Sequence, residues 1–161
     1  MMNRSRSLEN LQTALEMELT AMHQYMLHAH VLEDWGMDKL AAKMREEMNE
    51  ELGHANSFME RMMFLKQVPD VRPANEPHKA SSLTDMFQSD LKDEKEAIMF
   101  YTKAAKEAFE DGDVGTRALF EKIAIDEEGH MGWLELQLDL VERIGEPNFI
   151  MQHMADAGAA E

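Results

Sequence analysis

Two short segments, Glu51 to His54 and Glu127 to His130, carry the residues best suited to bind a metal ion. In each segment a carboxylate and an imidazole lie three positions apart, which places both side chains on one face of a helix. Carboxylate oxygens and imidazole nitrogens are common metal ligands, so the pattern indicates metal binding. A single Glu-x-x-His is a weak signal, however, because short motifs also arise by chance.

An internal repeat makes the signal strong. Both residues of the motif recur after 76 positions, and an upstream pair, Glu18 and Glu94, has the same separation. Tyr25 and Tyr101 follow it too. A repeat at fixed offset predicts two copies of one helical hairpin, related by a pseudo-two-fold axis. Each copy then contributes one Glu from its first helix and a Glu and a His from its second.

Hydrophobic periodicity predicts an all-α chain. Apolar residues recur at spacings of three and four, without a strand pattern, over residues 5–35, 38–66, 83–111, 114–145 and 147–154. Gly36 should end the first helix, and Ser82 and Asp113 should cap the third and fourth. Between Gln67 and Ser82 three prolines predict an extended connection. We therefore expect one domain, residues 1–161, that forms a four-helix bundle with one long crossover and a short C-terminal fifth helix.

Four glutamates interrupt the apolar stripes at core positions: Glu18, Glu51, Glu94 and Glu127. An ionised carboxylate without a partner is costly to bury, and four of them facing one another also repel. Two divalent cations would neutralise the cluster, with one imidazole completing the ligand set of each. The alternative, surface residues that are in phase by coincidence, is disfavoured because charged side chains rarely take core positions.

The ligands divide between the two metals. Glu51 and Glu127 should bridge, while Glu18 with His54 and their repeat counterparts, Glu94 with His130, should be terminal ligands. A mixed oxygen and nitrogen set suits iron or manganese better than calcium or magnesium, and zinc is not excluded.

Composition limits the function. The chain has no Cys, which excludes disulfides and thiolate metal sites. Its net charge of -16 argues against nucleic-acid binding and suits attraction of cations, although a solvated acidic surface explains much of that charge. No apolar run is long enough for a membrane span, and the N-terminal segment does not look like a signal peptide. We expect a cytoplasmic protein.

The chain resembles the bacterioferritins over essentially its whole length. The resemblance is carried by residues 24–30 (QYMLHAH), the Trp35-Gly36 break, residues 126–130 (DEEGH) and residues 133–135 (WLE). It implies a ferritin-like iron storage and detoxification subunit. Such a subunit is a ferroxidase, which oxidises Fe²⁺ with O₂ or H₂O₂ at a di-iron centre of two Fe ions. The ferric mineral is then deposited inside a homo-oligomeric shell of 24 subunits.

The resemblance also suggests roles outside the six ligands. Tyr25 matches a tyrosine beside the metals, where it would donate a hydrogen bond or an electron; an ordinary half-buried tyrosine is the alternative. Glu46, Glu47 and Glu50 match the part of the second helix that faces the cavity and would hold iron in transit. Exposed charge pairing is the commoner explanation for such a group.

One position departs from the family. Bacterioferritins bind haem b between two subunits through a Met that follows the bridging Glu of the second helix, and this chain has Leu52 there. Met48 is a weak substitute, because most methionines in a chain this rich in them fill the core. We expect a subunit that cannot ligate haem, in a haem-free shell or in one mixed with a haem-binding subunit.

Two other functions use the same ligands. One is a rubrerythrin-like di-iron peroxidase, although the missing Cys removes its usual electron relay. The other is a non-catalytic structural or iron-buffering subunit. The remaining histidines have no carboxylate partner at the repeat offset and are expected at the surface or an interface: His23, His28, His30, His78 and His153.

Overall fold

Five helices follow the apolar stripes of the chain. A computed structural model describes residues 4–156, and among these residues there is no β-strand. The helices are α1 (Ser5–Asp34), α2 (Asp38–Phe64), α3 (Leu83–Glu110), α4 (Val114–Ile144) and α5 (Glu146–His153). Each bound differs by at most two residues from the one expected from the sequence.

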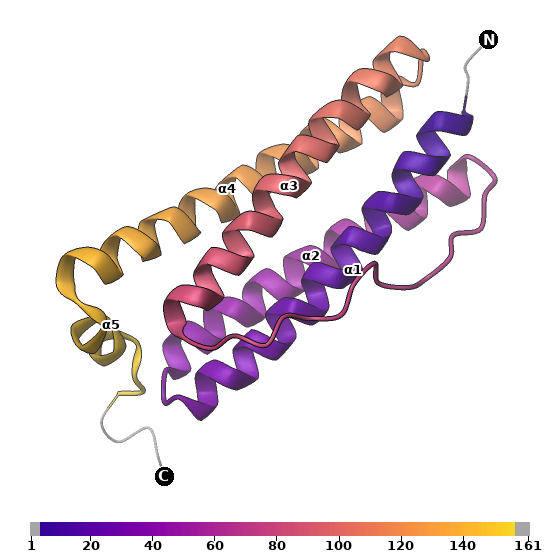
Figure 1. Cartoon of the computed structure of the whole chain (residues 1–161). Helices are drawn as coiled ribbons and strands as arrows, with labels where there is room; N and C mark the ends of the chain where they lie inside the picture. The colour runs from indigo at the N-terminus through magenta and orange to yellow at the C-terminus, as the bar shows by residue number, and fades with distance from the viewer. Residues whose placement is uncertain (1–3, 157–161) are drawn as a thin grey trace.

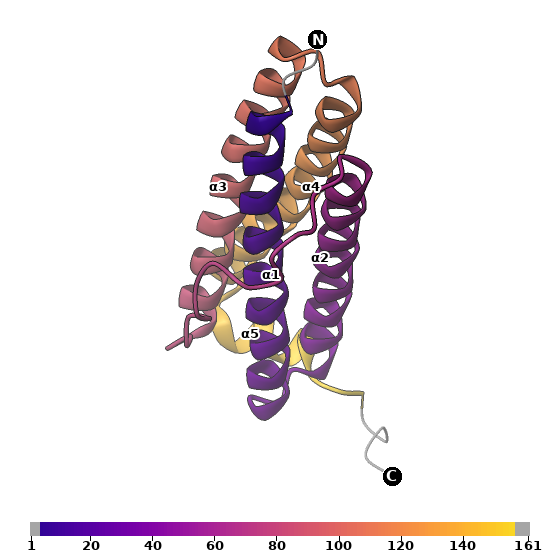
Figure 2. The ribbon, with the colours of Figure 1, turned by 90° about the vertical axis from the view of Figure 1, so that its right-hand side faces the viewer.

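The four long helices form two hairpins packed side by side. α1 pairs with α2 and α3 pairs with α4, while the short α5 covers one end of the bundle (Figure 1). α2 and α3 run in the same direction, as a long crossover requires. Seen from the side, α1 lies between α3 and α2, with α4 behind it (Figure 2). The all-α fold with one long crossover and a short fifth helix is therefore confirmed.

The crossover between α2 and α3 runs along α1 (Figure 2). Two side chains of α1 hold it there through its backbone. The Ala74 N–H donates to Oγ1 of Thr20 at 2.8 Å. Gln24 binds the backbone of His78 twice, accepting from its N–H at 2.7 Å and donating to its carbonyl at 3.0 Å. These hydrogen bonds hold the extended segment against α1.

Caps predicted from the sequence form at three helix ends. Gly36 has φ +83°, the left-handed conformation expected after α1. The Ser82 hydroxyl accepts from the Asp85 N–H at 3.0 Å at the start of α3. The Asp113 carboxylate accepts from the Thr116 N–H at the start of α4. These caps set the register in which the helices present their interior faces.

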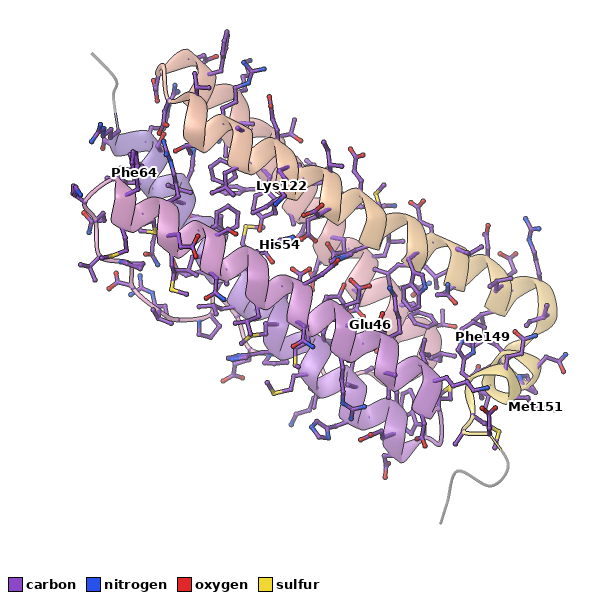
Figure 3. All side chains as sticks on the ribbon, turned by 180° about the vertical axis from the view of Figure 1, so that it is seen from behind. Glu46, His54, Phe64, Lys122, Phe149 and Met151 are labelled. Carbon is purple, nitrogen blue, oxygen red and sulfur yellow. The ribbon has the colours of Figure 1, made fainter. Side chains whose placement is uncertain are left out.

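Two apolar clusters fill the bundle and leave a polar layer between them. One cluster contains Phe58 and Phe120, and the other contains Phe87 and Phe149. His54 lies on the side of α2 that faces α4, while Phe149 lies between α5 and the bundle (Figure 3). The apolar clusters hold the helices together on both sides of the layer that contains the acidic residues.

The backbone at the end of α2 contains a strained position. Lys66 has φ 67°, and its N–H donates to the Met63 carbonyl at 3.0 Å in the turn that ends the helix. A non-glycine residue in this conformation costs roughly 1–2 kcal/mol, against roughly 0.5–1 kcal/mol for the extra entropy of glycine. Lys66→Gly should therefore raise the free energy of unfolding by about 0.5–1 kcal/mol in chemical denaturation. Lys66→Ala, which keeps the Cβ, should give no such gain; equal gains in both variants would contradict the strain argument.

Candidate metal centre

Six side chains from four helices converge in the polar layer. Each side chain continues the apolar stripe of its helix, so folding carries it into the interior, where it is 8% exposed or less. The residues are Glu18 on α1, Glu51 and His54 on α2, Glu94 on α3, and Glu127 and His130 on α4.

The six residues form two overlapping groups, each of which could hold a metal ion. The first group is Glu18, Glu51, His54 and Glu127, and the second is Glu51, Glu94, Glu127 and His130. Within each group one ligand atom from every residue lies within 4.8 Å of the others. Glu51 and Glu127 belong to both groups, the arrangement needed for carboxylates that bridge two ions.

The Nδ1 atoms of the two histidines face the carboxylates. Nδ1 of His54 lies 2.8 Å from Glu127 and 3.6 Å from Glu18. Nδ1 of His130 lies 3.0 Å from Glu51 and 3.4 Å from Glu94. The two imidazole rings are stacked with their centroids 6.3 Å apart. His54 therefore presents Nδ1 to the first group, and His130 presents Nδ1 to the second.

Each of the six residues has one buried side-chain atom without a hydrogen-bond partner among the described residues. These atoms are Nδ1 of both histidines and one carboxylate oxygen of each glutamate. Buried polar atoms are nearly always paired, and leaving one unpaired costs about 1–3 kcal/mol. A set of six that point to a common centre fits a pair of metal ions.

The pKa values of several residues in the centre are shifted because buried carboxylates lie close together. Burial, together with the neighbouring carboxylate of Glu18, raises the pKa of Glu51 well above its usual value. Burial opposes a charge on His54, but the carboxylates of Glu127 and Glu18 outweigh it and raise the pKa of His54 to about 10. The pKa of His130 is raised for the same reason. In the absence of metal, protons compensate the carboxylates, and a cation that binds there must displace them.

Two tyrosines bond the outer carboxylates across the hairpins. The Tyr25 hydroxyl donates to Glu94 at 2.5 Å, and the Tyr101 hydroxyl donates to Glu18 at 2.6 Å. Both tyrosines are at least 97% buried. Each therefore orients a carboxylate of the opposite repeat, and the repeat extends beyond the six candidate ligands. Tyr25 is fully enclosed rather than half-buried.

The far nitrogens of the histidines are held by acids that also obey the repeat. Nε2 of His54 lies 3.1 Å from Asp126, and Nε2 of His130 contacts Glu50. Asp126 and Glu50 are 76 positions apart, each directly before a bridging-position glutamate. A carboxylate behind a metal-binding imidazole fixes its orientation and tautomer. Sequence reasoning missed Asp126, although the same offset of 76 could have found it.

The repeat is broken beside His130. Glu47, 4% exposed, lies 2.6 Å from Nε2 of His130, whereas its repeat counterpart, Ile123, is apolar. Glu47, Glu50 and His130 form a third group with the geometry to hold a cation. Glu46 does not join this group: its side chain is exposed and lies 3.8 Å from Lys43. Lys43 also pairs with Oε1 of the buried Glu47, at 2.8 Å, so charge pairing accounts for Glu46 and for one oxygen of Glu47, while Oε2 of Glu47 faces His130.

The structure corrects the expectation for His28. Its side chain is fully buried, and Nδ1 lies 3.0 Å from Asp90, so His28 is neither at the surface nor without a carboxylate partner. The repeat criterion failed here because this pair has no counterpart at the offset. A usable signal was present, since His28 and Asp90 both fall in the apolar stripes of their helices.

The other four histidines occupy varied places. His23 is half-buried and His30 is exposed. His78 bonds Asp85 at 2.8 Å, and the His153 ring stacks on Phe149 with centroids 4.2 Å apart. None of the four contacts the six residues of the centre within the described chain.

Comparison with known proteins identifies the family. The ferritin-like domain family matches residues 8–144. The bacterioferritin of Rhodobacter capsulatus is 37% identical over 154 residues, which cover 96% of each chain. The bacterioferritin of Brucella melitensis is 36% identical over the same length, again with 96% of each chain covered. The chain belongs to the bacterioferritins.

A solved bacterioferritin has the same architecture. The structure of the Rhodobacter capsulatus protein matches with a TM-score of 0.94 at 36% identity, covering 99% of this chain and all of that one. It is described as having a metal-free dinuclear site and a haem iron in a crystallographic special position. The bacterioferritin resemblance seen in the sequence is thus confirmed.

Metal binding should stabilise this bacterioferritin, because a cation neutralises the carboxylates that otherwise repel one another. A divalent cation at about 100-fold excess over its Kd should add about 2.7 kcal/mol to the free energy of unfolding. Glu51→Gln keeps the side-chain size but removes one bridging charge. The variant should therefore be at least as stable as the parent without metal, and should lose most of the gain with Zn²⁺, as measured by thermal unfolding. Glu60→Gln, an exposed change on α2, should behave as the parent; undiminished Zn²⁺ stabilisation of Glu51→Gln would contradict the site.

Proposed function

We propose that this bacterioferritin is an iron storage and detoxification subunit with ferroxidase activity. The observation that carries the proposal is the convergence of six buried residues, each with one potential ligand atom that has no hydrogen-bond partner. Iron storage is the function of the family, and the donor set is suited to iron. Mn²⁺ or Zn²⁺ would bind the same groups as substitutes.

Two Fe²⁺ ions are the substrate of the proposed reaction. Each gives one electron, so that O₂ and two protons yield H₂O₂, or H₂O₂ and two protons yield two waters. Supplying both electrons at one place prevents release of one-electron oxygen products. Glu18 with His54 holds one ion, Glu94 with His130 holds the other, and Glu51 and Glu127 bridge them. All six act at the centre.

Tyr25 contributes to the same reaction by orienting Glu94. Its hydroxyl donates to the carboxylate at 2.5 Å, which holds one oxygen in place and leaves the other for the ion. Because the side chain is enclosed by protein, it is also placed to give an electron or a proton to the centre. Tyr101 orients Glu18 in the corresponding way.

Glu47 and Glu50 are proposed to receive iron that leaves the centre. Both contact Nε2 of His130, whose Nδ1 faces the carboxylates, so this imidazole lies between the two groups. One oxygen of Glu47 is buried without a hydrogen-bond partner. Glu50 is 60% exposed, which provides a step from the interior of the bundle to its surface. Glu46, expected from the sequence to take part, is exposed beside Lys43 and is left out of this path.

The subunit is proposed to assemble into a cytoplasmic homo-oligomeric shell, of 24 chains as in the family. None of the helices within residues 4–156 is long and apolar enough to cross a membrane. Large apolar side chains remain exposed on several helices, including Phe64, Phe109 and Ile125. Subunit contacts in a shell would cover such side chains. Light scattering separates a shell of this size from a smaller peroxidase assembly.

Substitution of a bridging ligand tests the reaction. Glu127→Ala should lower the initial rate of Fe²⁺ oxidation by more than about tenfold, because even outer-shell partners of metal ligands are worth roughly 10–100-fold. Stopped-flow absorbance at two Fe²⁺ per chain measures the rate, with circular dichroism to verify folding. Glu128→Ala removes an adjacent, exposed carboxylate and should keep the parent rate. Full activity in Glu127→Ala would overturn the site, and a parent without oxidation would favour a buffering subunit.

Haem binding tests the departure at Leu52. Leu52 is 41% exposed on α2, directly after Glu51, and has no lone pair to donate to haem iron. The homo-oligomer should show no bis-Met Soret band after reconstitution with haem b. Leu52→Met should gain one, since it restores the ligand at the family position. A bis-Met spectrum in the parent would show that Met48 or another methionine serves instead, and would remove the need for a second, haem-binding subunit.

A further inference from the structure

A cavity of about 340 Å³ leads from the surface to the metal centre between α1 and α3. The crossover forms its outer wall with Ala74, Glu76 and His78. At the inner end the cavity is lined by buried carboxylates of the centre, and at the other end by exposed acids such as Asp93 and Glu96. It therefore joins solvent to the ligands on the crossover side of the bundle.

The lining of this cavity is strongly negative. Eight of its residues carry carboxylates, and Lys92 is the single Lys or Arg among them. The acids are Glu18, Glu51, Glu76, Asp90, Asp93, Glu94, Glu96 and Glu127. A cleft lined by one sign of charge between low-dielectric walls concentrates ions of the opposite sign and speeds their entry. The field in the cavity favours a cation over neutral O₂.

Asp90 is the one acid in the cavity that is buried but lies outside the metal centre. It is 2% exposed, and its Oδ2 atom pairs with Nδ1 of His28 at 3.0 Å. Oδ1 has no hydrogen-bond partner, although it is buried. An unpaired carboxylate oxygen in a cavity wall is costly unless a cation compensates it. Glu94, one helical turn further along α3, also has an unpaired oxygen.

The crossover determines the orientation of Asp90 through two side chains. The His78 N–H donates to Oε1 of Gln24, so the Gln24 amide nitrogen is the group that faces His28. That nitrogen donates to Nε2 of His28 at 2.8 Å, which leaves the ring proton on Nδ1. Nδ1–H then donates to Oδ2 of Asp90, and Oδ1 of this cavity-lining residue is left without a hydrogen-bond partner.

The repeat shows that this network is not required by the bundle itself. At the offset of 76, Gln24 corresponds to Phe100 and His28 to Ala104, and Asp90 corresponds to Ala14. The other half of the bundle thus packs the same positions with apolar side chains. The polar set occurs only on the side that the cavity opens. Burying these polar side chains costs free energy, and binding of a passing cation would explain why they are kept on this side.

We propose that Asp90 is a transient binding site for a divalent cation that enters under the crossover, one helical turn before Glu94. The exposed acids Asp93 and Glu96 collect the ion, Oδ1 of Asp90 binds it, and Glu94 receives it at the centre. The inference rests on the proposed function only in taking the six-residue group as the destination.

The rate of Co²⁺ entry tests this site. Co²⁺ is not oxidised by O₂ on this timescale, and its visible absorption reports carboxylate and imidazole ligation at the centre. Asp90→Asn keeps the shape and can still accept from His28 but loses the charge. In stopped-flow mixing of the intact assembly, the variant should take up Co²⁺ about tenfold more slowly and reach the same final absorbance. Asp139→Asn, an exposed change on α4 outside the cavity, should match the parent.

A variant at the mouth keeps the test decisive if Asp90→Asn folds poorly. Asp93→Asn combined with Glu96→Gln changes exposed residues only, and should slow Co²⁺ entry and weaken its dependence on ionic strength. Unchanged entry in the variants that fold would overturn the proposal. So would a lower final absorbance in folded Asp90→Asn, which would make Asp90 part of the centre, or a defect seen only as a changed O₂ dependence of Fe²⁺ oxidation. A parent that binds Co²⁺ in this way but does not oxidise Fe²⁺ would refute the ferroxidase and leave the entry site intact.

Discussion

The burial of four carboxylates at one level of the bundle is the constraint on which the rest of the structure depends. Two apolar clusters enclose this layer, so each of the four acids is at most 4% exposed and poorly solvated, and their mutual repulsion opposes folding. Compensation has to come from positive charge in the same place. Protons on the carboxyl and imidazole groups provide it in the metal-free chain, and a pair of divalent cations would provide it with better geometry. Metal affinity and metal-free stability are therefore opposed in this protein.

Pseudo-symmetry explains how so short a chain builds two matched groups that could each hold a metal ion. One hairpin supplies half of a ligand set, and a second copy at an offset of 76 supplies the other half. The relation extends outward to the tyrosines that hold Glu18 and Glu94 and to the acids behind the two imidazoles. Because each half contributes the same groups, two ions bound there would lie in similar surroundings, which suits the proposed reaction that takes one electron from each.

The departures from symmetry give the bundle a direction. Glu47 has an apolar counterpart, and so have Gln24, His28 and Asp90. The first departure places an extra carboxylate behind His130, and the second places a polar network under the crossover. We infer that iron enters on the crossover side and leaves past His130. A symmetric site alone would distinguish neither entry nor exit.

The sequence by itself determined the helices, their caps, the crossover and the six residues of the centre, because periodicity and a fixed offset are properties of one dimension. The resemblance to the bacterioferritins further led us to propose that Leu52 stands where the family has its haem-ligating Met. Only the tertiary structure decided what contacts what. His28 was misjudged because its partner, Asp90, is on another helix at no repeated spacing, and Glu47 could be separated from Glu46 only by burial. The cavity exists because the crossover folds back along α1, and neither periodicity nor offset encodes that contact.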